Sequence, residues 1–157
     1  MSKGKEQGFT LVEVMTVLVI IGLMSSAVVL TMPRTKPAEE VLSQSLLAEL
    51  NIAAQDSLIT GRSVAVGFSN EGYGFFGFEE EQWVLARNMN WPELIDVSLT
   101  KNGRNIDLTD ELFPIVVFEP TGLSPSFQLN LTGAERAMCL ESHGDGRVAL
   151  MDTSCAA

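Results

Sequence analysis

One acidic side chain, Glu13, lies at the start of a long apolar segment and is the first residue of the sequence that suggests a specific chemistry. Residues 14–33 contain no charged side chain, and Val, Leu, Ile and Met dominate them. A charged side chain inside a membrane costs about 2.5–3.5 kcal/mol on insertion scales, so such an acid needs a partner. No Lys or Arg follows on this segment before Arg34. The partner of Glu13 must therefore come from elsewhere.

Residues 1–8 suggest where that positive charge originates. They form a short polar leader with Lys3 and Lys5, without the apolar region that precedes the cleavage site of an ordinary secretory signal. Cleavage between Gly8 and Phe9 would leave the apolar segment in the mature chain. It would also create a free amine at Phe9, with an unperturbed pKa of about 7.7–8.0. That cation could pair with Glu13 of a neighbouring copy or partner.

The apolar segment has the length of a membrane-spanning helix. At about 1.5 Å per residue, the uncharged run spans roughly 30 Å, the thickness of a bilayer's hydrocarbon core. The polar residues within it are small and can bond to carbonyls of their own helix. They are Thr16, Ser25, Ser26 and Thr31.

The stretch Gly8-Phe9-Thr10-Leu11-Val12-Glu13 resembles the class III leader of type IV pilins and type II secretion pseudopilins, with no departure from that pattern. The resemblance implies that a prepilin peptidase/N-methyltransferase cleaves after Gly8 and methylates Phe9. It also implies that Glu13 registers the subunit in a filament. The chain would then comprise a cleaved leader (1–8), a transmembrane and filament-core helix (9–32), and a periplasmic globular domain (33–157).

Beyond the apolar segment, residues 38–60 predict an amphipathic helix. Leucines at 42, 46 and 50 recur on one stripe, and most acidic residues, including Glu39, lie off it. Pro37 favours a helix start, and Gly61 is a suitable C-cap. The junction predicts either one kinked helix or two helices with a short break, and we favour the near-continuous form.

After Gly61 the apolar period falls to two, which indicates strands. Residues 63–78 predict a hairpin, and residues 136–152 predict a closing one. Between them lie further strand candidates at 82–87, 95–100, 105–108, 115–118 and 126–132. This order predicts an α+β pilin fold, in which a long N-terminal helix packs on a C-terminal antiparallel β-sheet domain. The early hairpin, the segment 118–122 and the late strands resemble the GspH/FimT group of minor pilins and pseudopilins.

That resemblance implies a structural role and no enzymatic activity. The chain would be a minor pseudopilin of a type II secretion system, held in the bacterial inner membrane with its C-terminal domain in the periplasm. Its partners would be other major and minor pseudopilins, the prepilin peptidase and the inner-membrane assembly platform. The alternative is a FimT/FimU-like minor type IV pilin in pilus assembly or DNA uptake.

The charge of the chain disfavours nucleic acid as a partner. The formal net charge is -10, and without residues 1–8 the chain has 8 basic and 19 acidic side chains. A nucleic-acid surface needs a basic patch that displaces phosphate counterions. After Arg136, the only basic side chain is Arg147.

The two cysteines, Cys139 and Cys155, could pair in an oxidising compartment, but sequence alone leaves this open. A disulfide closing such a loop would stabilise the fold by roughly 3 kcal/mol in the chain-entropy model.

Other motifs favour no catalytic, metal or cofactor site. Residues 72–77 fit GxGxxG, but they lie in an aromatic strand pattern after a turn, whereas a dinucleotide site follows a strand and opens a helix. Cys139, His143 and Asp145 could suggest a nucleophilic site, but a catalytic base must be oriented by a third group, and three residues in one tight hairpin rarely point to one place. Calcium could use residues 79–81 with Asp145 and Asp152, yet no ligand loop is recognisable. Zinc-ligand spacing is absent.

Overall fold

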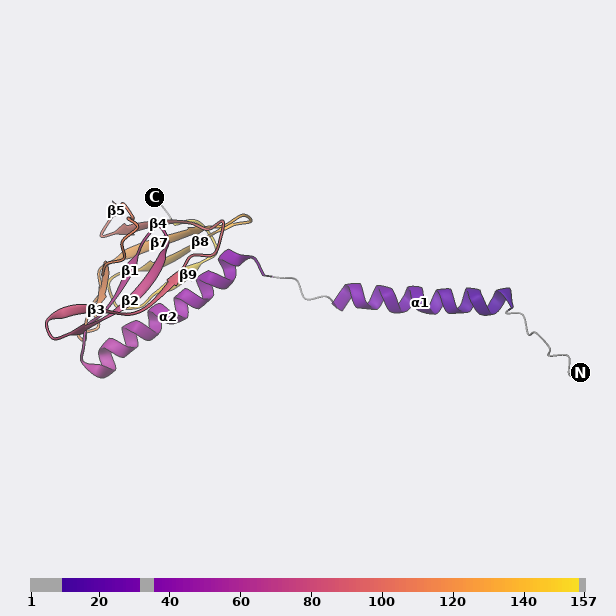
Figure 1. The fold of residues 1–157 in the computed structure, drawn as a ribbon, viewed down its shortest axis with the longest axis horizontal. Helices are drawn as coiled ribbons and strands as arrows, with labels where there is room; N and C mark the ends of the chain where they lie inside the picture. Colours follow the sequence, from indigo (N-terminus) through magenta and orange to yellow (C-terminus); the bar gives the residue numbers. More distant parts are fainter. Residues whose placement is uncertain (1–9, 32–35, 156–157) are drawn as a thin grey trace, which may run out of the picture. The chain divides into compact units, whose positions relative to one another are not determined.

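The computed structural model describes residues 10–31 and 36–155, and for residues 25–31 the backbone alone. The chain divides into two compact units, one ending at residue 35 and one beginning at Lys36. The first contains helix α1, Leu11–Thr31, and the described part of the second contains helix α2, Ala38–Thr60, and nine strands (Figure 1).

Helix α1 is apolar all round, and Glu13 is its one charged residue. The hydroxyl of Thr16 donates to the carbonyl of Val12 at 2.8 Å, the back-bond expected of a small polar residue in such a helix. We made the same prediction of back-bonds for Ser25, Ser26 and Thr31, whose side chains lie outside the part that the structure describes.

Helix α2 spans the range that the amphipathic pattern predicts. It begins after Pro37, whose ψ of 147° is extended, and Gly61 closes it with a left-handed φ of 69° and an N–H bond to the carbonyl of Ser57. Leu46 and Leu50 on its inner face are fully buried. The described residues on either side of the predicted junction form two helices, α1 and α2. Residues 32–35, where the sequence predicts a kink or a short break, lie outside the described residues.

The strands form two antiparallel sheets. One has four strands in the order β3-β2-β1-β6, and the other has five in the order β5-β4-β7-β8-β9. Their bounds are β1 Val64–Phe68, β2 Gly72–Glu79, β3 Gln82–Asn90, β4 Asp96–Lys101, β5 Arg104–Ile106, β6 Val116–Phe118, β7 Phe127–Thr132, β8 Ala137–Ser142 and β9 Ala149–Met151.

Two hairpins turn through two residues with positive φ. Asn102 and Gly103 join β4 to β5, whereas Glu80 and Glu81 join β2 to β3. Asn-Gly is the favoured pair for such a turn, because both positions need a left-handed backbone. Glu-Glu lacks that preference, and the second hairpin therefore carries backbone strain.

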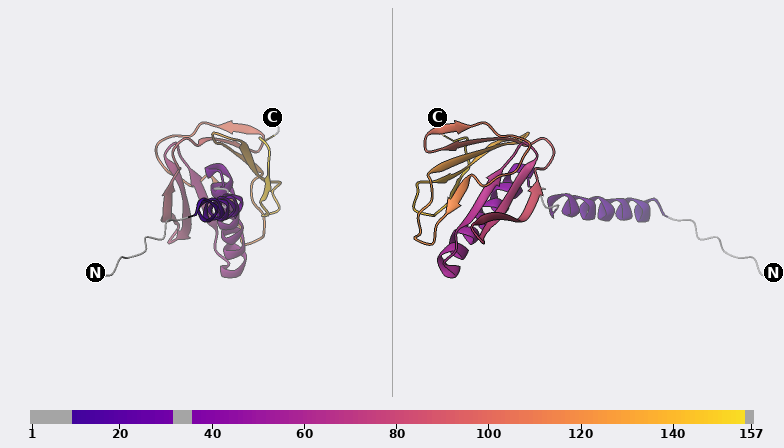
Figure 2. Two further views of the ribbon diagram at one scale, coloured as in Figure 1. Left: turned by 90° about the vertical axis from the view of Figure 1, so that its right-hand side faces the viewer. Right: turned by 60° about the vertical axis from the view of Figure 1, so that its left-hand side comes forward.

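The hydrophobic core lies between α2 and the two sheets. The strands of both sheets are arranged around α2 in the views of Figure 2, and α2 contacts strands of each. Leu129 and Leu131 of β7 are fully buried with Phe68 of β1 and Phe118 of β6. The alternating pattern of residues 126–132 therefore places its apolar side chains inward, as predicted.

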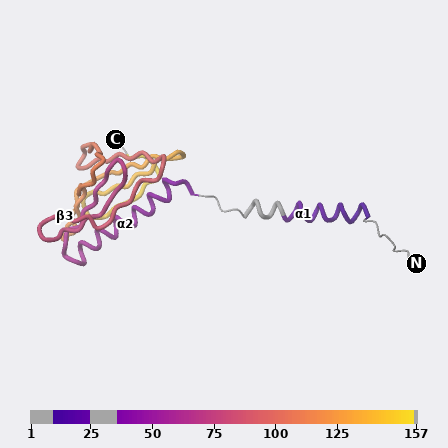
Figure 3. The backbone as a smooth tube through the Cα atoms, in the orientation of Figure 1, coloured from indigo at the N-terminus to yellow at the C-terminus, as the bar shows by residue number. Residues whose placement is uncertain are grey.

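The predicted α+β fold is confirmed, with differences in detail. The sequence left the number of sheets open, and the strands form two, because β6 pairs with β1 while β4 pairs with β7. Strand β3 continues to Asn90 rather than ending at residue 87, because its second half pairs with the start of β2. Strand β5 is shorter than predicted, spanning Arg104–Ile106. The tube in Figure 3 shows the β2–β3 hairpin extending beyond the neighbouring strands.

Candidate assembly site

The residues predicted for processing and assembly lie at the N-terminal end of the chain. Gly8 and Phe9 lie outside the described residues. Glu13 lies in the first turn of α1. Its backbone N–H donates to the carbonyl of Thr10 at 3.0 Å, and the hydroxyl of Thr10 lies 3.4 Å from the same nitrogen.

Thr10 and Glu13 have the spacing of a capping box. In that motif a Thr precedes the helix and a Glu occupies its third position, so that orphan N–H groups of the first turn gain partners. A negative charge in the first turn also interacts favourably with the helix dipole. The structure shows the Thr10 half of this motif, in which the hydroxyl of Thr10 accepts the N–H of Glu13, and we did not predict it, although Thr-x-x-Glu before an apolar run was a readable signal.

From Leu11 to Met24, α1 presents exposed apolar side chains. The large apolar residues between Leu11 and Met24 are 47–77 % exposed. A helix that is apolar all round is ordinarily buried, either in a protein interior or in a membrane. Among the described residues, no helix combines the length and apolarity that a membrane crossing requires. The single-pass anchor over residues 9–32 stays a prediction.

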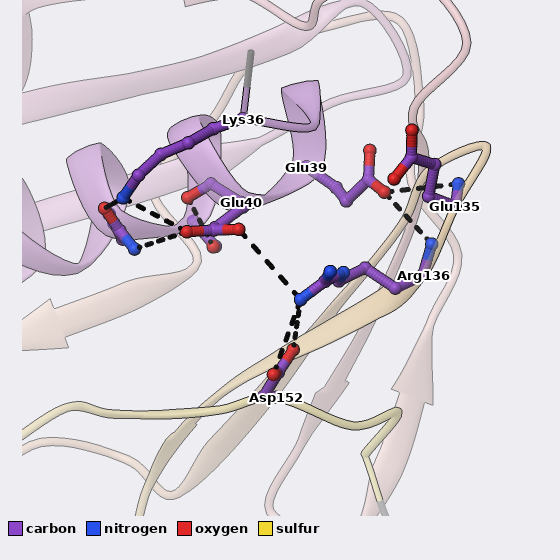
Figure 4. A network of polar contacts seen from close by, with 8 residues as sticks. Lys36, Glu39, Glu40, Glu135, Arg136 and Asp152 are labelled. Atoms are coloured by element: carbon purple, nitrogen blue, oxygen red, sulfur yellow. Dashed lines mark hydrogen bonds and ion pairs between the residues drawn. The ribbon is translucent and has the colours of Figure 1, made fainter. Parts of the chain in front are cut away.

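At the start of α2, the buried carboxylate of Glu39 binds the turn between β7 and β8 (Figure 4). Its side chain is only 2 % exposed, and its Oε1 atom accepts the backbone N–H groups of Glu135 at 3.2 Å and Arg136 at 3.0 Å. The N–H of Gly133 closes the same turn on the carbonyl of Arg136. A Cβ atom on Gly133 would overlap the Glu39 carboxylate. Glycine is therefore required for this contact.

The hydrogen bonds around Glu39 favour its charged form. The backbone N–H of Glu39 itself, followed by those of Arg136 and Glu135 and the Arg136 guanidinium, lowers the pKa of the carboxyl, although burial acts in the opposite direction. We placed Glu39 off the buried stripe of the helix, and that prediction was wrong. Its partners are 96 and 97 positions away, so no local pattern could reveal them.

The side chain of Arg136 lies between two acidic groups (Figure 4). Its Nη1 atom is 3.4 Å from Asp152 Oδ1 and 4.0 Å from Glu40 Oε2, and Glu40 also pairs with Lys36 at 3.1 Å. Exposed pairs of this kind contribute about 0–1 kcal/mol each. The network therefore adds little to the stability of the fold.

A disulfide joins Cys139 of β8 to Cys155, with the two Cα atoms 5.0 Å apart. Cys139 is fully buried, and the N–H of Cys155 donates to the side-chain oxygen of Asn130 on β7. The pairing that the sequence left open is thus present in the structure. It holds the segment after β9 against the second sheet.

The remaining candidate residues are not brought together. Residues 79–81 form the tip of the β2–β3 hairpin, whereas Asp145 bonds the N–H of Arg147 within the β8–β9 turn. His143 is 81 % exposed and lies 3.8 Å from Glu141. Within residues 10–31 and 36–155, no group of three or more His, Cys, Asp or Glu side chains could hold a metal ion. The GxGxxG match lies within β2, where a side chain on Gly74 would overlap Leu112.

Comparison with known proteins found one sequence motif at the N-terminal end. The prokaryotic N-terminal methylation motif matches residues 3–29. No curated protein sequence matches significantly.

Solved structures share the globular fold. Two structures of the minor pseudopilin EpsH from the type II secretion system of Vibrio cholerae match with TM-scores of 0.61 and 0.65, each at 12 % identity. They cover 73 % and 76 % of this chain and 96 % and 97 % of their own. The solution structure of E. coli GspH matches with a TM-score of 0.56 at 18 % identity, over 71 % of this chain and 85 % of GspH. The chain thus joins the prokaryotic N-terminal methylation motif to the fold of the minor pseudopilins, and its predicted resemblance to the H-type subunits is confirmed.

Proposed function

We propose that the chain is a minor pseudopilin of a type II secretion system, with a role in assembly rather than catalysis. The observation that carries this proposal is the presence, on one chain, of the methylation motif over residues 3–29 and a globular unit with the fold of EpsH. The alternative, a minor type IV pilin, shares the motif, but no feature of the described residues favours it over a pseudopilin.

In this proposal, removal of residues 1–8 leaves the helix beginning near Phe9 in the inner membrane, with the globular unit in the periplasm. The helix then leaves the bilayer to pack against the helices of other pseudopilins. The exposed apolar surface of α1 supports this, because such a surface needs either lipid or apolar protein around it.

Glu13 sets the position of the subunit in the filament by pairing with the methylated amine of a neighbour's Phe9. Glu13 is the one charged residue of α1, so a neighbour's amine has a single ionic partner on that helix. A slip of one helical turn would move the charges apart by about 5.4 Å and leave both unpaired in apolar surroundings. The pairing therefore specifies one register.

The test uses the full chain in its native bacterium, with the chromosomal copy replaced. We expect Glu13→Ala and Glu13→Gln to be made and cleaved but to be lost from the filament, with reduced protein secretion. Incorporation is measured by cross-linking to the other pseudopilins, and secretion by the amount of exported protein in the medium. Normal secretion with Glu13→Gln would contradict the ionic role.

The glutamine variant also separates pairing from helix capping, because Glu or Gln can serve at this position of a capping box. Thr10→Ser is the matched control, since serine preserves the cap and the charge of Glu13, and we expect normal incorporation. Mass spectrometry of the mature N-terminus should find methylated Phe9. An N-terminus at Met1 or Ser2 in assembled material would refute the whole proposal.

A further inference from the structure

Strand β3 is a long sheet edge that no described strand covers. The two sheets have four edge strands, and three of them, β5, β6 and β9, are three residues long. Strand β3 has nine residues (Figures 1 and 3). Very short edge strands are one way in which proteins avoid pairing with other chains, because an edge exposes a row of unpaired N–H and C=O groups. Strand β3 is the exception in this fold.

The residues of β3 provide little other protection. The strand contains no proline and no lysine, and its only charged side chain, Arg87, pairs with Glu49 of α2 at 3.3 Å. Val84 and Leu85 are 40 % and 45 % exposed. A bulge in the pairing with β2 is its one protective feature.

Apolar surface continues from this edge on both sides. Near the hairpin tip, Phe78 of β2 is 41 % exposed and packs edge-on against Trp83, with ring centroids 5.0 Å apart. Nearer α2, a groove runs between the helix and strands β2 and β3. Its apolar lining includes Ile52, Ala53, Val64, Phe75, Phe76 and Ala86. An added strand could therefore gain apolar contacts as well as backbone hydrogen bonds.

The hairpin tip indicates the charge of the partner. Glu79, Glu80 and Glu81 are consecutive and exposed, and two of them occupy the left-handed positions where Asn-Gly would be more stable. The chain uses Asn-Gly at the equivalent turn between β4 and β5. Three acids at the end of an apolar edge are complementary to a strand that ends in basic side chains.

A second copy of the chain is a poor occupant by the same argument. Residues 36–157 carry 7 basic and 18 acidic side chains, so two copies repel. In an antiparallel edge-to-edge pair, each acidic hairpin would lie beside residues 88–90 of the other copy, which are uncharged and offer the acids no basic partner.

We propose that the free edge of β3 binds an extended segment of another protein in antiparallel orientation, with apolar side chains along its length and basic side chains at its C-terminal end, beside Glu79–Glu81. Antiparallel pairing is the arrangement of every strand pair in the fold and is slightly more stable than parallel pairing. This inference rests on the edge and its charge, and does not depend on the type II secretion role.

The probe is a synthetic fluorescent peptide of alternating Val and Thr, as long as β3, with Lys-Lys at an amidated C-terminus. Its binding to the purified full chain in detergent is followed by fluorescence anisotropy. Two control peptides complete the set. One has its backbone N-methylated at alternate residues, which removes strand hydrogen bonds, and the other ends in Glu-Glu. We expect the unmethylated lysine-ended probe to bind about tenfold or more tightly than either control peptide.

Protein variants test the surface itself. Leu85→Lys places a charge on the edge and should abolish binding, because lysine on an edge strand opposes pairing. Ile59→Lys is the matched control on α2, where Ile59 is 82 % exposed, and it should bind normally. Glu80→Asn with Glu81→Gly removes two charges while relieving the turn. We expect this variant to unfold at a higher temperature and yet to bind several-fold more weakly, which a folding defect cannot explain.

Each other outcome overturns the proposal. If the wild type and Leu85→Lys bound the probe equally, the edge of β3 would not be the binding site. If the Glu-ended peptide bound as tightly as the lysine-ended one, the acidic hairpin tip would not select basic side chains. Cross-linked dimers that disappear with Leu85→Lys would make the occupant a second copy. Absence of binding by every peptide would exclude strand addition. Since no filament is needed, failure here would leave the Glu13 experiment unaffected.

Discussion

Glu39 and Arg136 lie 97 positions apart in sequence, yet the Oε1 atom of Glu39 accepts the backbone N–H of Arg136 at 3.0 Å. The neighbouring N–H of Glu135 binds the same oxygen. This contact attaches the first turn of α2 to the turn between β7 and β8, and so fixes the end of the globular unit from which the chain leads back to α1. The acceptor is a buried carboxylate whose charge strengthens both bonds, which makes the contact testable by mutation and by pH.

Replacing Glu39 with Gln should lower the stability of the globular unit at neutral pH. Both N–H groups bond the single oxygen Oε1, so the amide oxygen of Gln can accept both, but it lacks the negative charge that strengthens these bonds. Because the pKa of Glu39 is lowered in the folded state, its contribution is complete above the unfolded value near 4.5 and is lost as the pH falls through the folded value. Thermal unfolding from pH 7 to pH 2 should show the two proteins converging in acid.

The matched control for this experiment is Glu135→Gln, because Glu135 contributes only its backbone N–H to the contact and its side chain is exposed. We expect it to unfold as the wild type does. A difference between Glu39→Gln and wild type that persists unchanged at pH 2 would contradict the ionic interpretation.

Gly133→Ala should destabilise the fold by about 1–3 kcal/mol, the usual cost of overpacking. The new Cβ would overlap the Glu39 carboxylate. The decisive measurement is a double-mutant cycle in urea with Glu39→Ala, which removes the overlapping carboxylate and leaves only the Glu39 Cβ atom, 2.9 Å from the new Cβ. We expect Gly133→Ala to cost less in that background than in the wild type. Gly77→Ala, where the nearest atom is 4.0 Å from the new Cβ, is the control for the loss of glycine itself.

Removing the disulfide with Cys139→Ala and Cys155→Ala should cost about 3 kcal/mol in the chain-entropy model, since the bond closes a loop of 16 positions. Alanine is preferred to serine because Cys139 is fully buried and a hydroxyl there would lack a partner. A reducing agent should destabilise the wild type equally and leave the double variant unchanged. An effect of reductant on the variant would locate the sensitivity elsewhere.

Tyr73, the single tyrosine of the chain, should ionise only above its ordinary range. Burial, then the charge of Glu49 and the hydrogen bond to it, raises the pKa of the phenol above the usual 10.0. Stability from this group is present below pH 10 and is lost as the pH rises through the folded value. Ultraviolet titration should therefore show tyrosinate later in the folded protein than in urea. Glu49→Gln should bring the two curves closer together.

Much of the fold could be predicted because its signals are local. The range of α2 follows from a repeat of three and four residues, and its end follows from the left-handed position of Gly61. The strand pattern of β7 is an alternation within six residues. Prediction failed for the length of β3, and the division into two sheets was not predicted, because both depend on strand pairing. Pairing partners are set by contacts between distant segments, which periodicity does not record.

The sequence by itself determined the leader motif, the single acid of the first helix and the order of helices and strands, because each is written in consecutive residues. Only the tertiary structure decided that Glu39 is buried against the β7–β8 turn, that Cys139 meets Cys155, and that β3 is left as a long free edge. The physical reason is the same in each case. Burial and pairing depend on which distant parts of the chain come together, and the free energy of that choice belongs to the packed core as a whole.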